Sequence, residues 1–418
     1  MPEAGYETPG ARQHEGFLVL TAWGCARRLR CGILDACNGG YVMDRADVII
    51  VGGGIAGLGV AYHLAQAGVR RVLLLEREAL LASHSSGRNA AIFRPLDTIP
   101  GVVELATRSR VLLDALLDEE RGGWLHQVGL LLVSALPAEL DDLREVAQRS
   151  GLAHEIMERQ GIESVVPQLA GGGAAHGLFL PDAGVVDAHA IVTCLARSAK
   201  AAGARLTTGT AVKRVQTSRG RVEGVELENG DRVPADIVVI AAGAWASGLG
   251  ASCGAELPLT PLRRHLVQLE ARLAKATPVV WSVGDEVYFR AESGGVLASP
   301  CDEEPWPAGV PPVAAAALEG LAEKLARLAP PLGRGSVRRA WACLRTSASD
   351  RAPVAGEDPR VTGLFWLAGL GGYGMTAGMA AAEMVVALVC GRQPPIAVRS
   401  APARLLPGAT RSLPVPGG

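Results

Sequence analysis

The stretch from residue 47 to residue 76 constrains the fold of this chain more than any other part of it. Residues 47–51 (DVIIV) form a short β-branched run, and residues 52–57 (GGGIAG) follow it without a gap. A helical pattern then covers residues 55–67, and a second apolar run covers residues 71–76 (RVLLLE). This order of strand, glycine turn, helix and strand predicts the first βαβ unit of a Rossmann-like domain.

The three spaced glycines of this unit each have a physical role in binding a dinucleotide. The first allows the tight turn, the second lets a pyrophosphate approach the backbone, and the third lets the helix pack closely on the strand. The start of the helix offers free N–H groups to phosphates, and the acidic residue after the second strand accepts hydrogen bonds from an adenosine ribose. The dinucleotide contacts predicted from this unit are Gly52, Gly54, Ile55, Ala56, Gly57 and Glu76.

Composition limits the other classes of function. The 41 basic and 42 acidic residues give a net charge of -1 with no long run of either sign, which argues against nucleic acid as a partner. No apolar stretch reaches the ~18 residues that a transmembrane helix needs. The eight cysteines are scattered without a C-x-x-C pair, so we expect neither a disulfide framework nor a metal site. A reducing cytoplasm is the expected compartment, and peripheral association with an inner membrane is the alternative.

The two ends of the chain lack the patterns of a packed domain. Residues 1–42 show no hydrophobic periodicity, and their one apolar run precedes a pair of arginines, whereas a secretory signal has its positive charge first. Met43 directly precedes the first strand. We therefore expect residues 1–43 to be a disordered or non-native extension, and the proline-rich residues 396–418 to be an irregular tail.

Three further stretches resemble one family of flavoproteins. Residues 83–91 (SHSSGRNAA) form a polar loop rich in N–H and hydroxyl donors, residues 236–245 (DIVVIAAGAW) form a strand and turn, and residues 364–375 (LFWLAGLGGYGM) combine a last strand with a glycine loop. In this order they resemble the D-amino acid oxidase superfamily of FAD-dependent oxidoreductases. The resemblance implies FAD as the cofactor, with the glycine loop and the helix after it facing the isoalloxazine. The further FAD contacts that it implies are Arg77, Ser85, Ser86, Gly87, Arg88, Asn89, Ala90, Ala91, Val212, Ala242, Gly243, Trp245, Arg345, Gly371, Gly372, Tyr373, Gly374 and Met375.

Within this superfamily the chain is most similar to bacterial D-arginine dehydrogenase-type enzymes and other D-amino acid dehydrogenases. The similarity implies that an α-amino acid, most of all a D-amino acid, loses hydride from Cα to flavin N5, and that the imine hydrolyses to a 2-oxo acid and ammonia. The implied partners are a small amino acid or amine substrate and an electron acceptor, either a quinone or oxygen. The similar stretches are residues 75–78, 84–88, 181–187, 282–300, 341–345 and 371–374.

The same resemblance implies a set of catalytic residues around the substrate. Arg345 matches the family's carboxylate-binding arginine, because a planar guanidinium grips a carboxylate with two parallel hydrogen bonds. Tyr288 matches a tyrosine that faces the same pocket, with a half-buried tyrosine on a strand face as the alternative. Arg264 falls at a further active-site arginine, but the neighbouring Arg263 leaves that match open, and a solvated surface charge is the other interpretation.

The chain departs from the D-arginine enzymes where the substrate side chain binds. The acidic residue that pairs with a cationic side chain falls at Gly129, and three other pocket residues correspond to Ile92, Arg94 and Asp97. Without that counter-charge a guanidinium substrate is costly to desolvate, so we expect no basic substrate. Arg94 holds a carboxylate in one interpretation, as an arginine does in sarcosine oxidase-like relatives, and faces the surface in the other.

Two positions bear on the flavin itself. Cys343 lies near the position where sarcosine oxidase-type enzymes carry the cysteine that bonds to the flavin, whereas D-arginine-type relatives have glycine there and bind FAD non-covalently. We expect non-covalent FAD, and the alternatives for Cys343 are a covalent link or a small buried apolar residue. The lysine that assists oxygen in sarcosine oxidases would fall near Leu297, which favours a dehydrogenase.

The order of the motifs predicts an α/β protein, α+β overall, in which a Rossmann-like FAD-binding domain is interleaved with a substrate domain built on an antiparallel sheet. We expect the FAD-binding domain to comprise residues 44–124, 176–252 and 339–395, and the substrate domain to comprise residues 125–175 and 253–338. The expected strands of the antiparallel sheet include residues 279–289 and 295–298, and the expected helices include residues 188–201 and 318–328.

Other functions stay open on the sequence alone. A sarcosine or glycine oxidase-like enzyme and a 2-hydroxy acid dehydrogenase share the fold and the chemistry at Cα. A non-metabolic FAD-binding protein, either RNA-modifying or sensory, shares only the fold. An NAD-dependent dehydrogenase shares only the first βαβ unit and lacks the glycine loop at residues 371–374.

Overall fold

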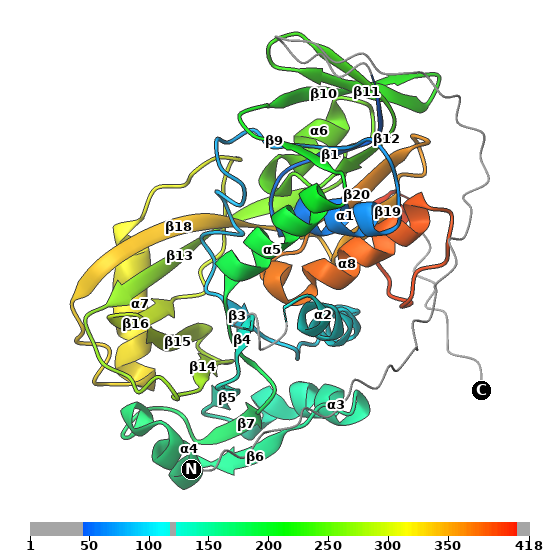
Figure 1. Ribbon diagram of the computed structural model, residues 1–418. Coiled ribbons are helices and arrows are strands. Elements are labelled where there is room, and N and C mark those ends of the chain that lie inside the picture. Colours follow the sequence, from blue (N-terminus) through cyan, green and yellow to red (C-terminus); the bar gives the residue numbers. More distant parts are fainter. Residues whose placement is uncertain (1–44, 118–122, 408–418) are drawn as a thin grey trace, which may run out of the picture. The chain divides into compact units, whose positions relative to one another are not determined.

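The computed structural model describes residues 45–117 and 123–407, and two large β-sheets organise this part of the chain (Figure 1). The first sheet has eight strands in the order β10-β11-β12-β1-β2-β9, with β20 paired to β12 and β19 paired to β20. Its strands are β1 (Ala46–Val51), β2 (Val72–Leu75), β9 (Arg205–Thr207), β10 (Val212–Ser218), β11 (Arg221–Leu227), β12 (Arg232–Ile240), β19 (Val354–Glu357) and β20 (Leu364–Ala368).

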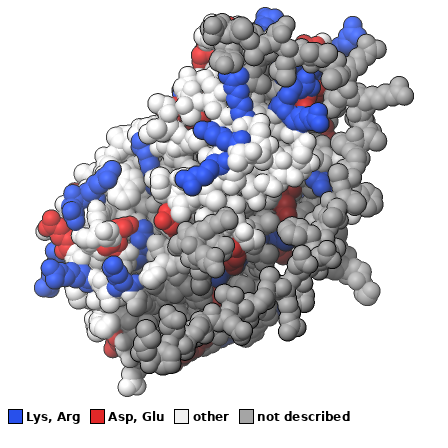
Figure 2. Space-filling model, in the orientation of Figure 1, with Lys and Arg blue, Asp and Glu red and all other residues white. Residues whose placement is uncertain are grey.

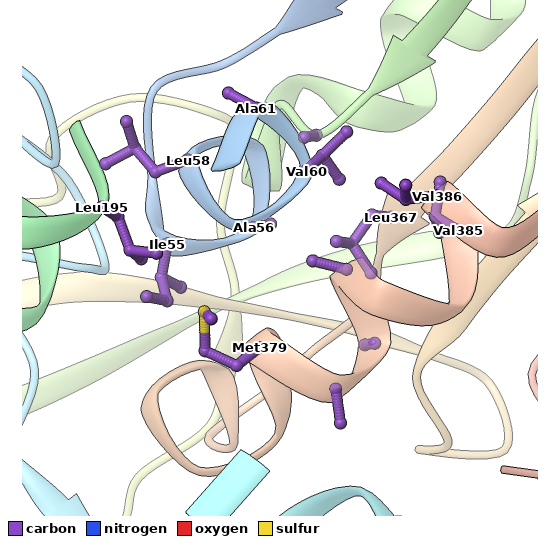
Figure 3. Packing of buried hydrophobic residues seen from close by; sticks show 14 of the residues in the cluster. Ile55, Ala56, Leu58, Val60, Ala61, Leu195, Leu367, Met379, Val385 and Val386 are labelled. Carbon is purple, nitrogen blue, oxygen red and sulfur yellow. The ribbon is translucent and has the colours of Figure 1, made fainter. Parts of the chain in front are cut away.

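The centre of this sheet is parallel and is covered on both faces. β1 pairs in parallel with β12 and with β2, and its alternate residues enter two different cores, Val48 and Ile50 in one, Ile49 and Val51 in the other. This is why its sequence reads as a continuous apolar run. The first core packs the sheet against three helices (Figure 3), which are α1 (Ile55–Gln66), α5 (Ala188–Ala201) and α8 (Gly374–Val389). The second core includes α6 (Ala246–Ala251), which follows the short turn η4 (Gly243–Trp245).

The second sheet has nine strands and is antiparallel except where β14 runs parallel to β5. The order is β17-β13-β16-β15-β14-β5-β7-β6, and the long β18 pairs with β13. Helix α7 (Ala315–Leu328) packs its apolar side against one face of this sheet. The strands are β5 (Leu130–Ser134), β6 (Glu155–Glu158), β7 (His176–Leu180), β13 (Leu259–Leu269), β14 (Val279–Ser282), β15 (Val287–Glu292), β16 (Gly295–Ser299), β17 (Glu304–Pro305) and β18 (Val337–Ala348).

A three-stranded sheet and several short elements complete the described fold. In this small sheet, β8 (Gly184–Val186) pairs with β3 (Ile92–Phe93) and β4 (Leu125–His126). Helix α2 (Val102–Leu116) packs on α8. The remaining elements are η2 (Pro137–Leu140), α3 (Asp141–Arg149), α4 (Arg159–Val165), η3 (Pro167–Leu169) and η5 (Pro402–Leu405).

The structure confirms the predicted fold class and corrects some element bounds. The helix predicted at residues 188–201 has those bounds, whereas α7 begins three residues before the predicted residue 318. The single strand predicted at residues 279–289 is in fact two antiparallel strands, β14 and β15. A turn over residues 283–286 separates them, and it ends at Glu286 with a left-handed φ of 49°. Apolar residues on both sides of the turn hid it from the sequence pattern.

The proposed domain boundaries stay a prediction, and strand pairing differs from them at two places. β7 and most of β18 belong to the nine-stranded sheet, whereas the proposed partition counts them with the FAD-binding domain. The predicted extension at residues 1–43 lies outside the described residues, as does the end of the predicted tail beyond residue 407. Within the described ranges, no helix is both long enough and apolar enough to cross a membrane.

Candidate active site

A cavity of about 720 Å³ lies at the carboxyl ends of the parallel strands, with its other wall formed by strands of the second sheet. It reaches the ends of β1, β12 and β20 on one side and β13, β15 and β18 on the other. Open α/β sheets bind ligands at this end of their strands, and the volume is in the range of small-molecule sites, about 300–1,000 Å³. The cavity therefore has a nucleotide end at β1 and a second end at the antiparallel sheet, which we call the substrate end.

The glycine turn at the nucleotide end is shaped by close backbone contacts. Gly52 has a φ of 111°, and a Cβ atom there would collide with the carbonyl of Ala241. A Cβ atom on Gly57 would collide with the carbonyl oxygen of Gly52. These two glycines are thus required for the turn and for the packing of α1, while Gly54 lines the cavity.

The carboxylate of Glu76 is held in place directly after β2. It is buried, and its two oxygens accept hydrogen bonds from the backbone N–H groups of Gly53 (2.6 Å) and Glu78 (2.8 Å). Each carboxylate oxygen retains a further lone pair. Glu76 lines the cavity, so it can accept hydrogen bonds from the hydroxyls of a ribose.

Two helices begin at the cavity wall and supply positive dipole ends. α1 has no side-chain cap from its N-cap residue Gly54, and the N–H of Ile55 donates to Ser86 Oγ at 3.0 Å. α8 begins after Tyr373 and also lacks a side-chain cap. The first residues of both helices line the cavity, so their N–H groups suit a pyrophosphate and an electron-rich flavin edge.

The loop between β2 and β3 forms the floor of the cavity between these helix ends. Ser85 Oγ donates to the carbonyl of Leu344, and Asn89 closes the loop by donating to Ser86 O (2.6 Å) and accepting from Ala91 N (2.6 Å). Farther out, the guanidinium of Arg77 lies over the ring of Trp245, with its Cζ 4.7 Å from the ring centroid. The residues of this loop are therefore fixed by local hydrogen bonds in a cavity-facing arrangement.

Of the predicted FAD contacts, all but Gly57 and Gly87 line the cavity. Gly87 has a structural role like that of Gly57, because a Cβ atom there would collide with the carbonyl of Ala82. A glycine cradle, an oriented carboxylate and two helix N-termini are the donor and acceptor set that a flavin dinucleotide requires. The residues present thus fit FAD.

At the opposite end of the cavity, Arg345 presents an unbalanced charge. Three arginines are buried in the described chain; Arg263 pairs with Glu304 and Arg290 pairs with Glu292. Arg345, only 7% exposed, has no carboxylate within ion-pairing distance among the described residues, and its Nη1 donates to Cys343 Sγ at 2.9 Å.

Tyr288 lies on β15 close to Arg345 and Arg264 and lines the cavity. Its side chain is buried, and its ring packs 4.6 Å from that of Trp281 on β14. Burial raises the pKa of Tyr288 to about 12, while the two arginines oppose the rise. The hydroxyl therefore remains protonated at neutral pH and can donate a hydrogen bond.

Arg264 lines the cavity, but unlike Arg345 it has a carboxylate partner. Its Nη2 donates to Glu303 Oε1 at 2.7 Å, and Arg351 donates to the same carboxylate. The arginine side chain is only 12% exposed, so the solvated surface charge that was the alternative does not describe it. The neighbouring Arg263 faces away from this group, with its guanidinium on the ring of Trp306 at 4.1 Å.

Arg94 also lines the cavity and is largely buried. Its guanidinium pairs with Asp97 at 2.8 Å and lies on the ring of Trp281, 4.4 Å from the centroid. Asp97 in turn accepts a hydrogen bond from Tyr373 in the glycine loop. The side chain does not face the surface, and its carboxylate partner comes from the protein.

Cys343 and Cys301 are both buried and line the same end of the cavity. The Cys343 thiol donates to the carbonyl of Arg88 at 3.3 Å, within the loop expected to contact the flavin. Burial raises the pKa of Cys301 to about 11. Among the described residues, no group of three or more His, Cys, Asp or Glu side chains is arranged to hold a metal ion.

Two positions compared with relatives in the sequence lie outside the cavity lining. Gly129 has a φ of 82°, and a Cβ atom there would collide with the ring of Phe179, so a longer side chain does not fit. Leu297 is buried in a cluster with Tyr288 and Cys343. Ile92, in contrast, lines the cavity.

Several lining residues escaped the sequence analysis. They belong to loops and to strand β14, which meet only in the folded chain, and no motif marks them. Three of them have left-handed backbone angles that non-glycine residues rarely adopt, Glu286 (49°), Cys301 (52°) and Arg351 (62°). Backbone strain of this kind clusters at functional sites, and it is the signal that a sequence does not show. The missed lining residues include Trp281, Glu286, Cys301, Glu303, Ala308, Gly309, Val310, Pro311 and Arg351.

Comparison with known proteins bears on this site. The family model described as FAD dependent oxidoreductase (DAO) matches residues 47–388. Glycine oxidase of Geobacillus kaustophilus is 30% identical over 337 residues, which cover 78% of this chain and 88% of that enzyme. Its solved structure superposes with a TM-score of 0.75 at 27% identity, covering 85% of this chain and 97% of that one.

Two further similarities show less about this chain. Human mitochondrial dimethylglycine dehydrogenase is 29% identical over 275 residues, 62% of this chain, and the match spans only 31% of that enzyme. The solved structure of L-proline dehydrogenase from P. horikoshii superposes with a TM-score of 0.79 and covers 87% of this chain and 98% of that one. At 24% identity, the second similarity shows the fold alone.

Proposed function

Because the chain belongs to the DAO family of FAD-dependent oxidoreductases, we propose that it oxidises the amine of a small α-amino acid that it holds by the carboxylate. The observation that carries this proposal is the buried guanidinium of Arg345, which lines the cavity without a carboxylate partner among the described residues. A buried cation is unfavourable until an anion joins it, and the parallel N–H groups of arginine match a carboxylate.

The residues around the substrate have distinct tasks in this reaction. Bound FAD supplies the hydride acceptor, flavin N5. Arg345 binds the substrate carboxylate, and the Tyr288 hydroxyl donates to it because its raised pKa, about 12, keeps the proton in place. Two fixed points on the carboxylate orient Cα–H toward the cofactor end of the cavity, which is the positioning that hydride transfer requires.

A D-amino acid is the donor that we favour. The resemblance to D-amino acid dehydrogenases supports it, as do the apolar walls that Ile92, Ile99, Trp281 and Val283 give to the substrate end. The buried Asp97 is already paired with Arg94, so it offers no free counter-charge to a basic side chain. We therefore propose a D-amino acid with an uncharged side chain.

A glycine-type amine is the second candidate. It is favoured by the similarity to glycine oxidase and dimethylglycine dehydrogenase, whose names specify glycine or its N-methylated derivative. Carboxylate binding by Arg345 serves these substrates equally, because they share the α-carboxylate. Within either candidate we propose a dehydrogenase that passes electrons to a quinone or another acceptor, since the oxygen-assisting lysine of sarcosine oxidases would fall near Leu297.

Anaerobic reduction of the bound flavin tests the proposed function. The FAD-loaded protein is mixed with D-amino acids, their L-enantiomers, glycine, sarcosine and 2-hydroxy acids, and loss of the oxidised flavin absorbance is recorded. We expect selective reduction by D-amino acids, whereas reduction by glycine and sarcosine alone would support the second candidate. Reduction by hydroxy acids only, or by no member of the panel, would overturn amine oxidation. Readmitting air or adding a quinone then identifies the acceptor.

A further inference from the structure

The guanidinium of Arg94 is fixed on three sides at the substrate end of the cavity. Its Nε donates to the carbonyl of Leu96 at 3.1 Å, its Nη2 pairs with Asp97, and its face rests on Trp281. A guanidinium has five N–H donors. These two polar partners leave several N–H groups at the edge that lines the cavity. Arg94 is therefore placed where it could bind an anionic group of a substrate.

Asp97 removes the net charge from that position. Its side chain is only 10% exposed, and it accepts hydrogen bonds from both Arg94 and the Tyr373 hydroxyl. Burial raises the pKa of Tyr373, so this hydroxyl remains a donor and adds no charge. The buried pair of Arg94 and Asp97 is thus neutral as a unit.

The other charged groups near Arg94 each have a partner or lie farther out. Arg264, a cationic neighbour in the cavity, shares Glu303 with Arg351. Asp302 is bound to His265. Glu286 is exposed at the rim of the cavity. Arg345 is therefore the buried cation at the substrate end that lacks a carboxylate partner among the described residues.

We propose that Asp97 is a specificity-determining residue, which neutralises Arg94 so that the site accepts a substrate with one carboxylate and rejects one with two. The proposal rests on the proposed function, because it assumes that Arg345 binds the substrate carboxylate. A second carboxylate beside Arg94 would meet the negative charge of Asp97 in a poorly solvated place, where like charges repel strongly. Removing that charge would convert Arg94 into a second anion site.

Binding of non-oxidisable carboxylates to the FAD-loaded protein tests this. Acetate and malonate carry one and two carboxylates, and perturbation of the flavin absorbance spectrum gives their Kd values without turnover. In the wild type we expect malonate to bind no better than acetate. Asp97→Asn keeps the volume and a hydrogen-bonding group, and we expect it to improve malonate binding relative to acetate about tenfold, the effect of one modest charge interaction.

Three further variants make the test specific. Arg94→Gln leaves the charge of Asp97 without a partner. We expect this variant to weaken the binding of malonate more than the binding of acetate, which is the opposite of the effect of Asp97→Asn. The double variant Arg94→Gln/Asp97→Asn should return to the wild-type ratio, as a coupled pair requires. Asp141→Asn is the matched control, because Asp141 also pairs with an arginine three residues away, Arg144, but on an exposed helix. It should leave the ratio unchanged.

The outcomes separate this proposal from the proposed function. The role of Asp97 would be overturned if the ratio of malonate affinity to acetate affinity were unchanged in both single variants. It would also be overturned if the double variant gained as much malonate affinity as Asp97→Asn. If no carboxylate perturbs the wild-type flavin, then Arg345 does not form the anion site and the inference fails with it. If the carboxylates bind and discriminate as expected but no amine reduces the flavin, the charge pairing stands and amine oxidation is wrong.

Discussion

Arg345 and Arg94 line the same cavity but differ in how their charges are balanced. Arg94 has a carboxylate of the protein beside it, whereas Arg345 has the thiol of Cys343 as its hydrogen-bond acceptor. Thiols are weak acceptors and carry no charge when protonated. Arg345 can therefore bind an external anion, whereas the pair of Arg94 and Asp97 limits which other substrate groups fit in the cavity.

The first prediction concerns Arg345→Lys. Lysine keeps the charge but loses the planar pair of donors, so substrate should be held less firmly and with less orientation. We expect kcat/KM for the amino acid substrate to fall about a hundredfold, equivalent to roughly 3 kcal/mol, as for other truncations at buried charged contacts. Steady-state kinetics measure it, with Arg338→Lys at the exposed end of β18 as the control. A change of less than about twofold, which is within ordinary scatter, would remove Arg345 from the site.

The second prediction concerns how FAD is held. The Cys343 thiol is engaged by the Arg88 carbonyl and by Arg345, and the cavity provides many non-covalent contacts for the dinucleotide. We expect acid denaturation to release the flavin into the supernatant from the wild type and from Cys343→Ser alike. Flavin that stays with the precipitated wild type but leaves Cys343→Ser would demonstrate the covalent link instead.

Local and distant residues of the site differ in how well the sequence predicts them. Gly52, Gly54 and Glu76 are predictable because their roles follow from backbone geometry within about 25 residues of chain, a βαβ unit with a known pattern. The Arg264–Glu303 pair joins positions 39 residues apart through the pairing of two strands and a loop. Nothing in either local sequence specifies that approach, so the sequence left Arg264 open and missed Glu303.

At the scale of elements, the packing of α1 on the end of β1 decides whether the nucleotide end can form. Gly57 brings the helix backbone against the carbonyl of Gly52, and this approach aims the first turn of α1 at the cavity. The alternation of β1 between two cores then fixes the strand. Sequence periodicity predicted these elements within about one residue, whereas the β14–β15 turn was missed because its apolar flanks look like one strand.

The third prediction concerns Gly57→Ala. Its Cβ atom would collide with Gly52 O, so α1 must shift away from the turn. We expect a loss of unfolding free energy of about 3 kcal/mol, comparable to overpacking of a core, together with loss of FAD binding. Gly320→Ala in α7 is the matched control, because no atom lies within 4 Å of the methyl carbon that this substitution would add, and alanine favours a helix. Chemical denaturation and flavin fluorescence provide the two measurements.

The fourth prediction concerns the interface of α1, α2 and α8. His63 of α1 lies beside the ion pair of Arg108 and Glu383, and burial lowers its pKa from 6.5 to about 4. The unfolded state therefore binds more protons than the folded state between these two values, so stability falls as the pH falls from about 6.5 toward 4. We expect the wild type to lose about 2 kcal/mol more than His63→Leu between about pH 7 and pH 5. Equal losses in urea denaturation would exclude His63 as the cause.

On the scale of the whole molecule, the cavity is built jointly by the parallel sheet and the antiparallel sheet. The nucleotide end depends on the first, and Arg264, Tyr288 and Arg345 stand on strands of the second. On the face that Figure 2 shows, basic and acidic side chains lie in separate small groups, so charge does not concentrate in one continuous patch there. The joint cavity suits a small ligand that contacts both sheets.

The fifth prediction follows from that joint construction. A ligand that contacts residues of both sheets stabilises them together, and at a hundredfold excess over its Kd it adds about 2.7 kcal/mol. We expect FAD added to the apoprotein to raise Tm by about 3 °C and to sharpen unfolding into one transition. NAD should give no shift in Tm. The loop at residues 83–91 and the glycine loop before α8 are expected to contact a flavin, and the nicotinamide of NAD would not make those contacts. Differential scanning calorimetry measures both. Stabilisation by NAD and not by FAD would contradict the assignment of the cofactor, and a shift confined to one of two transitions would show that the sheets unfold independently.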